Sequence, residues 1–259
     1  YLFAGCDDFV DIKTQGTLVP EATENYRYLL NNTSSWEWGP NLPDIASDDV
    51  ELVDATEQVK ALLSSEYYAY WHKAYTWQSE IYPIGGYYNS DGSWNSLYNT
   101  IAYANIVISE VPSSKGGTDG EKQALIAEAL VHRADAYLML VNMYAKPYNA
   151  TTAGSDLGVP LMLSVNSTQA LIRNPIQAVY DQILADLQTA LPSLPEVQQY
   201  NTLPSKVSAY GELARTYLCM GNYEKANLYA DSALISRSTI NDLSNITAIS
   251  SDNYPIRLY

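Results

Sequence analysis

The chain has 259 residues, which is enough for one large domain or two small ones. It carries 14 Lys and Arg against 29 Asp and Glu, a formal net charge of −15. An acidic chain repels nucleic-acid phosphates and anionic lipid head groups, so we exclude a nucleic-acid partner and docking through a polybasic surface. Tyr (23) and Trp (5) far outnumber Phe (2), and such amphipathic rings suit either helix interfaces or surfaces that bind partly hydrated ligands.

The first residues predict a targeting signal rather than a structural element. Ala4 and Gly5 precede Cys6 directly and follow two apolar residues, an arrangement that resembles the cleavage box of bacterial lipoproteins. We therefore interpret residues 1–5 as a signal-peptide remnant, Cys6 as a lipidated residue and 6–20 as a tether. Asp7 and Asp8 resemble the acidic signal that sends lipoproteins to the outer face of the outer membrane. Acyl chains on Cys6 would hold the protein there without a membrane-spanning helix.

The first half of the chain alternates helical patterns with polar loops. Apolar residues at helical spacing predict a short helix over 21–32 and a longer one over 56–80, the latter with Val59, Leu63 and Ala74 on one face. The segments 33–54 and 81–92, rich in Asn, Ser, Pro and Gly, are expected to be loops. A third amphipathic pattern runs over 93–110.

The second half continues in the same way. A long helix is predicted from about residue 120 to 144, followed by an irregular stretch over 146–168. Asn174 and Pro175 look like the cap and first position of a helix that ends before Pro192. Ser205 caps the next helix, which runs to about Met220, and its partner covers 223–235. No strand alternation is present, so we predict an all-α chain with one helical domain over 21–259.

Residues 203–236 have the pattern of a tight helix hairpin. Small residues mark the close approach, and Tyr210, Leu213 and Tyr217 face them; the small residues are Ala214, Ala226, Ala230 and Ala233. This spacing resembles the tetratricopeptide repeat. Such pairs need stacked neighbours to bury their apolar faces, and the helices at 120–145 and 174–191 could form a second pair. We therefore expect stacked tetratricopeptide-like helix pairs with long loops.

Four segments in order resemble the SusD/RagB family of nutrient-binding outer-membrane lipoproteins. They are the start at Cys6-Asp7-Asp8; Trp94, Leu97, Tyr98, Ile101, Ala104 and Asn105; Glu128, Ala129, Arg133, Ala134 and Tyr137 with 157–161; and Val179, Tyr180, Ile183, Asp186, Leu187 and Ala190 with the hairpin. The resemblance implies a cell-surface protein of a Gram-negative bacterium that captures an oligosaccharide and delivers it to a SusC-like TonB-dependent transporter. Family members are about twice as long, so we expect 21–259 to be the N-terminal portion of a SusD-like domain whose C-terminal half is missing.

Most motif residues are interpreted as structural. Trp94, Tyr98 and Asn105 share one helix face, and we expect them to pack and to anchor a loop. Arg133 with Glu128 or Asp186 would form a buried polar pair that locks the stack. Cys219 is expected on the buried stripe of its helix, as a free thiol.

Two aromatic loops supply the candidate ligand residues, because sugars bind flat aromatic rings with polar groups beside them. The candidates are Trp36, Trp38, Asp49, Trp77, Tyr82, Tyr87, Tyr88 and Asn89. The alternative is that Trp36 and Trp38 tuck under their loop as a small satellite core.

An enzyme is not expected. No nucleophile elbow, phosphate loop or zinc spacing is present, and neither a cofactor nor a metal is predicted. The alternative to glycan capture is a peptide- or protein-binding tetratricopeptide scaffold.

Overall fold

The computed structural model describes residues 21–32, 42–48, 50–52, 56–64, 69–82, 91–165, 171–198, 200 and 202–239. Within these ranges all regular structure is helical, apart from two isolated β-bridges. The helices are α1 (Thr23–Leu30), α2 (Leu42–Ile45), α3 (Glu57–Ser64), α4 (Ala69–Tyr75), α5 (Gly92–Glu110), α6 (Asp119–Tyr144), α7 (Ile176–Ala190), α8 (Lys206–Cys219) and α9 (Tyr223–Ser236).

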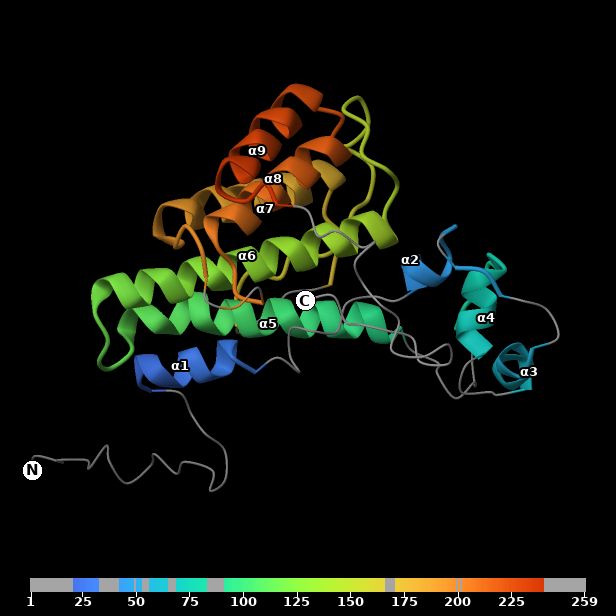
Figure 1. Ribbon diagram of the computed structural model, residues 1–259, viewed down its shortest axis with the longest axis horizontal. Coiled ribbons are helices and arrows are strands. Elements are labelled where there is room, and N and C mark those ends of the chain that lie inside the picture. Colours follow the sequence, from blue (N-terminus) through green and yellow to red (C-terminus); the bar gives the residue numbers. More distant parts are fainter. Residues whose placement is uncertain are drawn as a thin grey trace, which may run out of the picture.

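The long helices form one stack (Figure 1). α5 and α6 lie side by side, α7 packs on the other side of α6, and α8 and α9 continue beyond α7. α1 lies under α5 and also contacts α6, while the short helices α2, α3 and α4 gather at the end of the stack where α5 begins. The predicted all-α class and the stacking of helix pairs are therefore confirmed.

Local sequence explains why α6 begins where it does. The Thr118 hydroxyl accepts from the Glu121 amide and the Glu121 carboxylate accepts from the Thr118 amide, a reciprocal capping box. Just before it, Gly116 and Gly117 both have positive φ, at 72° and 67°, which a glycine adopts without strain. The chain can thus reverse tightly between α5 and α6.

A buried polar network crosses the stack. Arg133 on α6 donates from Nε and Nη2 to the two carboxylate oxygens of Asp186 on α7, at 2.8 and 2.7 Å. Its Nη1 donates to the Asn105 side-chain oxygen on α5 at 2.8 Å. Of the two predicted partners for Arg133, Asp186 is therefore the one used, and Glu128 is instead bonded to Arg27 of α1. This network links three consecutive helices through one guanidinium.

A second charged cluster lies between α6 and α8. Arg215 is bonded to Glu212 at 2.7 Å and lies 3.7 Å from Asp135. Burial raises the pKa of Asp135 to about 7, the negative charge of Glu212 adds to this increase, and the charge of Arg215 opposes it. Among the described residues, Oε2 of Glu212 is buried and finds no hydrogen-bond partner. The Arg215 guanidinium therefore lies beside two carboxyl groups, those of Glu212 and Asp135.

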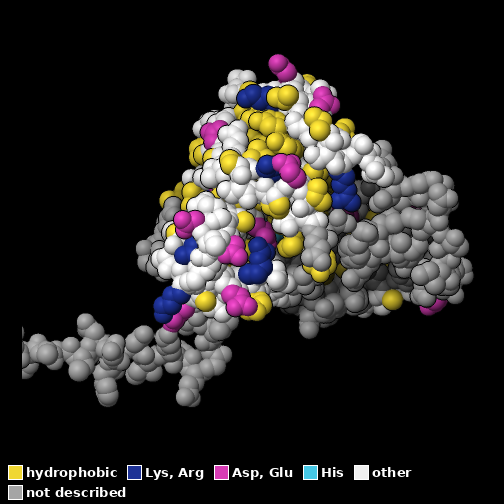
Figure 2. Space-filling model, turned by 60° about the vertical axis from the view of Figure 1, so that its left-hand side comes forward, with side chains coloured by type: hydrophobic (Ala, Val, Ile, Leu, Met, Phe, Trp, Pro, Cys, Tyr) yellow, Lys and Arg dark blue, Asp and Glu magenta, His cyan; other side chains and the backbone are white. Residues whose placement is uncertain are grey.

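The predicted hairpin is present as α8 and α9. Ser205 caps α8 as expected, Gly221 has a φ of 72° in the turn, and Asn222 caps α9. Tyr217 and Tyr229 stack across the pair with ring centroids 5.6 Å apart. The outer side of α9 leaves Tyr223, Leu228, Leu234 and Ile235 exposed. Figure 2 shows hydrophobic side chains at the surface of this upper part of the stack.

Four expectations about the helices were wrong. The predicted helix over 56–80 is two short helices, α3 and α4, and Leu63, expected on the apolar face, is exposed near the end of α3. Asn174 does not cap α7, because its side-chain oxygen accepts from the Leu161 amide instead. Cys219 is exposed, since the buried stripe of α8 passes through Leu213 and Tyr217 and leaves the last residue off it. The predicted loop over 33–54 also contains the short helix α2.

Candidate functional site

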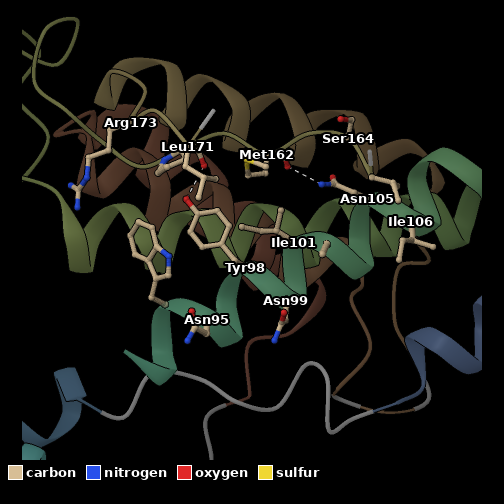
Figure 3. Close-up of a pocket in the computed structure, with 14 residues that line it drawn as sticks. Asn95, Tyr98, Asn99, Ile101, Asn105, Ile106, Met162, Ser164, Leu171 and Arg173 are labelled. Atoms are coloured by element: carbon tan, nitrogen blue, oxygen red, sulfur yellow. Dashed lines mark hydrogen bonds between the residues drawn. The ribbon is translucent and has the colours of Figure 1, made fainter. Parts of the chain in front are cut away.

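A groove bordered by described residues runs along α5 and has a volume of about 850 Å³ (Figure 3). α5 forms one wall. The other wall is the irregular segment between α6 and α7, here called the return segment (residues 157–165 and 171–175). The groove is lined by Trp94, Asn95, Tyr98, Asn99, Ile101, Ala102, Asn105, Ile106, Pro160, Met162, Ser164, Val165, Leu171 and Arg173.

Side chains of α5 and α6 fasten the return segment by its backbone. The Tyr98 hydroxyl donates to the Pro160 carbonyl at 2.8 Å, and the Asn105 amide donates to the Met162 carbonyl at 2.8 Å. The Tyr137 hydroxyl donates to the same Met162 carbonyl and accepts from the Met162 amide. The expected loop-anchoring role of Tyr98 and Asn105 is therefore confirmed.

Burial widens the pH range over which these anchors can donate. It raises the pKa of both Tyr98 and Tyr137, so each hydroxyl keeps its proton well above neutral pH. The Asn105 oxygen accepts from Arg133, which orients its amide nitrogen toward the return segment. The buried network between the helices thus sets the shape of the groove wall.

An aromatic cluster closes the groove at the start of α5. Trp94 lies 4.9 Å from Tyr98 and 4.9 Å from Tyr144, measured between ring centroids. The Arg173 guanidinium lies 5.9 Å from the Trp94 ring centroid. Its Nη1 donates to the carbonyls of Tyr144 and Gly158 at 2.8 and 3.2 Å. Arg173 therefore ties the return segment to the end of α6.

Asp91 holds this end of the groove in place. Its carboxylate accepts from the amides of Ser93 and Trp94 as the cap of α5, and from the hydroxyls of Tyr144 at 2.6 Å and Tyr82 at 3.3 Å. Burial raises the pKa of both tyrosines, and the neighbouring Asp91 charge adds to the increase. One carboxylate thus joins three parts of the chain: the end of the segment after α4, α5 and α6.

Two of the predicted ligand residues fall within the described ranges. Trp77 follows α4 with a φ of 52°, and 78% of its surface is exposed. Tyr82 is half-buried, because its ring stacks on Tyr70 at 5.7 Å and its hydroxyl is bonded to Asp91. The remaining candidates, Trp36, Trp38, Asp49, Tyr87, Tyr88 and Asn89, lie outside the described residues, as does Cys6.

The structure adds groove residues that the sequence did not single out. Asn95 and Asn99 are exposed one helical turn apart on α5, and within the described ranges neither side chain has a hydrogen-bond partner. Ser164, Leu171 and Arg173 reach the groove from the return segment. Their loop has no periodicity, so only the tertiary return of the chain could reveal them.

No group of three or more His, Cys, Asp or Glu side chains in the described ranges is placed to hold a metal ion. None of the described helices combines the length and the apolarity that crossing a bilayer requires.

The described fold is a stack of helix pairs with a groove along α5 that aromatic rings and amides line. Residues 9–218 match the SusD-like family described as starch-binding and associating with the outer membrane, so the chain belongs to this family. It is 32% identical over 133 residues to SusD-like protein P2 of Formosa agariphila, across 51% of this chain and 25% of that protein.

Two crystal structures have the same fold. A SusD superfamily protein from Bacteroides thetaiotaomicron matches 82% of this chain and 46% of its own, with 23% identity and a TM-score of 0.63. A SusD-like carbohydrate binding protein from Bacteroides vulgatus matches 86% and 47%, with 18% identity and a TM-score of 0.64. The chain therefore spans about half the length of these structures and a quarter of the curated relative.

Proposed function

We propose that this chain captures an oligosaccharide in the groove along α5, as part of a lipid-anchored protein at the surface of the outer membrane. In this proposal Cys6 carries the acyl chains, and the glycan passes on to a SusC-like TonB-dependent transporter. The family description as starch-binding and associating with the outer membrane supports both the ligand class and the location.

The observation that carries the proposal is the chemistry of the groove lining. Trp94 and Tyr98 present aromatic rings, and Asn95 and Asn99 present amides that are unpaired within the described ranges. Aromatic rings pack against the C–H faces of sugars, and amides can both donate to and accept from their hydroxyls. A volume of about 850 Å³ lies within the range of small-ligand sites.

The proposal also includes the exposed Trp77 as a ligand contact. An indole with 78% of its surface in water contributes little to folding, whereas it can stack on a sugar ring. The proposal also assigns ligand contacts to Trp36, Trp38, Tyr82, Tyr87, Tyr88, Asn89 and Asp49. For Tyr82 the contact would involve the ring edge, because its hydroxyl is bonded to Asp91.

A glycan array followed by affinity gels tests the proposal on the soluble form with Cys6 removed. We expect binding to one polysaccharide class. Replacing Asn95 and Asn99 together by Ala should weaken it about 10-fold or more, since two hydrogen bonds are lost. The matched control is Asn227→Ala, an exposed asparagine on α9 that bonds Asp231. Unchanged glycan affinity in the double variant would refute the groove as the site.

A peptide- or protein-binding scaffold is the second candidate, and the exposed apolar side of α9 favours it. Tyr223 and Ile235 are 72% and 87% exposed at the two ends of this helix. An apolar helix face of this kind can pack against another helix. Binding of peptides but of no glycan on the same arrays would favour this second function over the first.

A further inference from the structure

The groove is electrically unlike the rest of the chain. Residues 92–109, which make up almost all of α5, include no charged side chain. Residues 157–180 include no Asp or Glu and a single basic residue, Arg173. In a chain with a net charge of −15, the residues that line the groove thus carry one formal charge, the positive charge of Arg173.

Within the described ranges, Arg173 is held by uncharged partners. Its Nη1 donates to two backbone carbonyls and its guanidinium lies over the Trp94 ring, all of which are uncharged partners. No carboxylate pairs with it in the part of the chain that the structure describes. The acid at this end of α5, Asp91, already accepts from two amides and two hydroxyls.

Within the described ranges, the other donors of Arg173 have no protein acceptor. A guanidinium has five N–H groups in a planar fork, and only Nη1 is bonded to the protein in the described ranges. The residue is exposed and lines the groove (Figure 3). Such a fork matches the two oxygens of a carboxylate or a sulfate, and stacking on an aromatic ring fixes its plane.

We propose that the groove selects glycans that carry an anionic group, with Arg173 binding that group and Asn95 and Asn99 binding neighbouring hydroxyls. The inference rests on the proposed glycan function and names its substrate class. The shared chemistry is an oxyanion, supplied either by the carboxylate of a uronic acid or by a sulfate ester.

The overall negative charge of the protein does not oppose this assignment at physiological salt. Charges in water are screened over about 8 Å at that ionic strength, so the distant acids act weakly on a ligand in the groove. Arg173 acts over contact distances, where screening is small. The local sign of charge therefore decides which ligand the groove accepts.

Pairs of glycans with the same sugar backbone but different charge provide the test, with affinities measured by isothermal titration calorimetry on the soluble full chain. One pair is oligogalacturonate and its methyl ester, and the other is a sulfated galactan oligosaccharide and its desulfated form. We expect an anionic member to bind about 10-fold or more tightly than its neutral partner, with the advantage shrinking as salt is added. The pair that shows the preference identifies the source of the oxyanion.

Variants tie the preference to one side chain. Arg173→Gln should abolish the anionic advantage, and Arg173→Lys, which keeps the charge but not the fork, should retain only part of it. Lys225→Gln is the matched control, because Lys225 is a cation that lies 5.0 Å from the Tyr217 ring centroid away from the groove. If Arg173→Gln disturbs folding, the salt dependence of the anionic preference in the unmutated chain still tests the proposal.

The outcomes separate this inference from the function on which it rests. If both neutral glycans bind as tightly as their anionic partners or more tightly, the proposed role of Arg173 is wrong but the glycan function stands. The same conclusion follows if the anionic preference survives Arg173→Gln in a folded variant. Failure of every glycan on the array to bind overturns the proposed function and this inference together.

Discussion

Replacing Asp186 by Ala is expected to destabilise the stack strongly, because it leaves Arg133 buried without its counter-ion. The side chains of Arg133 and Asp186 are only 7% and 3% exposed, and two hydrogen bonds of 2.8 and 2.7 Å join them. Removing one partner of such a pair costs about 3–5 kcal/mol, since the remaining charge stays desolvated. In a domain of this size the melting temperature should fall by about 6–20 °C.

Urea and thermal unfolding followed by circular dichroism measure this effect. The control is Asp181→Ala on the same helix, where an exposed carboxylate accepts from Gln177 and its loss should cost less than about 1 kcal/mol. Replacing both partners, Arg133→Met with Asp186→Leu, should recover most of the lost stability, because no buried charge remains. A loss in Asp186→Ala no greater than in Asp181→Ala would refute the assignment of this pair as a buried lock.

Three further predictions concern other parts of the stack. Between about pH 4 and pH 7 the unfolding free energy should fall by roughly 1–2 kcal/mol as pH rises. The reason is that Asp135 keeps its proton in the folded state up to a pKa of about 7 but loses it near 3.8 when unfolded. The expected fall is smaller than this pKa difference alone would give, because 34% of the Asp135 side chain is exposed. Urea titrations at both pH values test this, and Asp135→Asn should flatten the difference. Asp91→Ala should lower stability by about 2 kcal/mol through the lost cap and tyrosine contacts, measured by urea unfolding, and an unchanged midpoint would contradict it. Gly117→Ala should cost about 1–3 kcal/mol, because φ is 67° and the added Cβ would lie 2.8 Å from the Thr23 side chain, whereas Gly211→Ala in open space within α8 should raise the melting temperature.

Periodic segments are the part of this fold that sequence alone predicts well. The patterns over 93–110 and 120–144 become α5 and α6 with nearly the expected bounds, and the hairpin becomes α8 and α9. Their stripes are long enough for apolar spacing, caps and glycine turns to agree. The short helices α2, α3 and α4 are less predictable, because a helix of two turns or fewer leaves little periodicity to detect.

The site was predicted less completely, for a geometric reason. Trp94 and Tyr98 stand out because they belong to a recognisable helical motif, which we interpret from the sequence as packing and loop anchoring. Asn95 and Asn99 share that helix but look like ordinary surface amides until the groove beside them is known. Arg173 lies in a loop, and its meaning depends on Tyr144 and Gly158, which are brought to it only by tertiary folding. The spacing of residues along the chain does not reveal contacts that form only in the folded structure.

The way in which the return segment is fastened has an evolutionary consequence. Tyr98, Asn105 and Tyr137 hold it through the carbonyls of Pro160 and Met162 and the amide of Met162, so the bonds involve backbone atoms that every sequence retains. Side chains such as Ser164 and Leu171 face the groove without contributing to these bonds. Substitutions there can alter what the groove recognises while the helical stack keeps its stability. Lineages that diversify their ligands could thus do so by drift in one loop, and protein engineers could randomise the same positions on an intact scaffold.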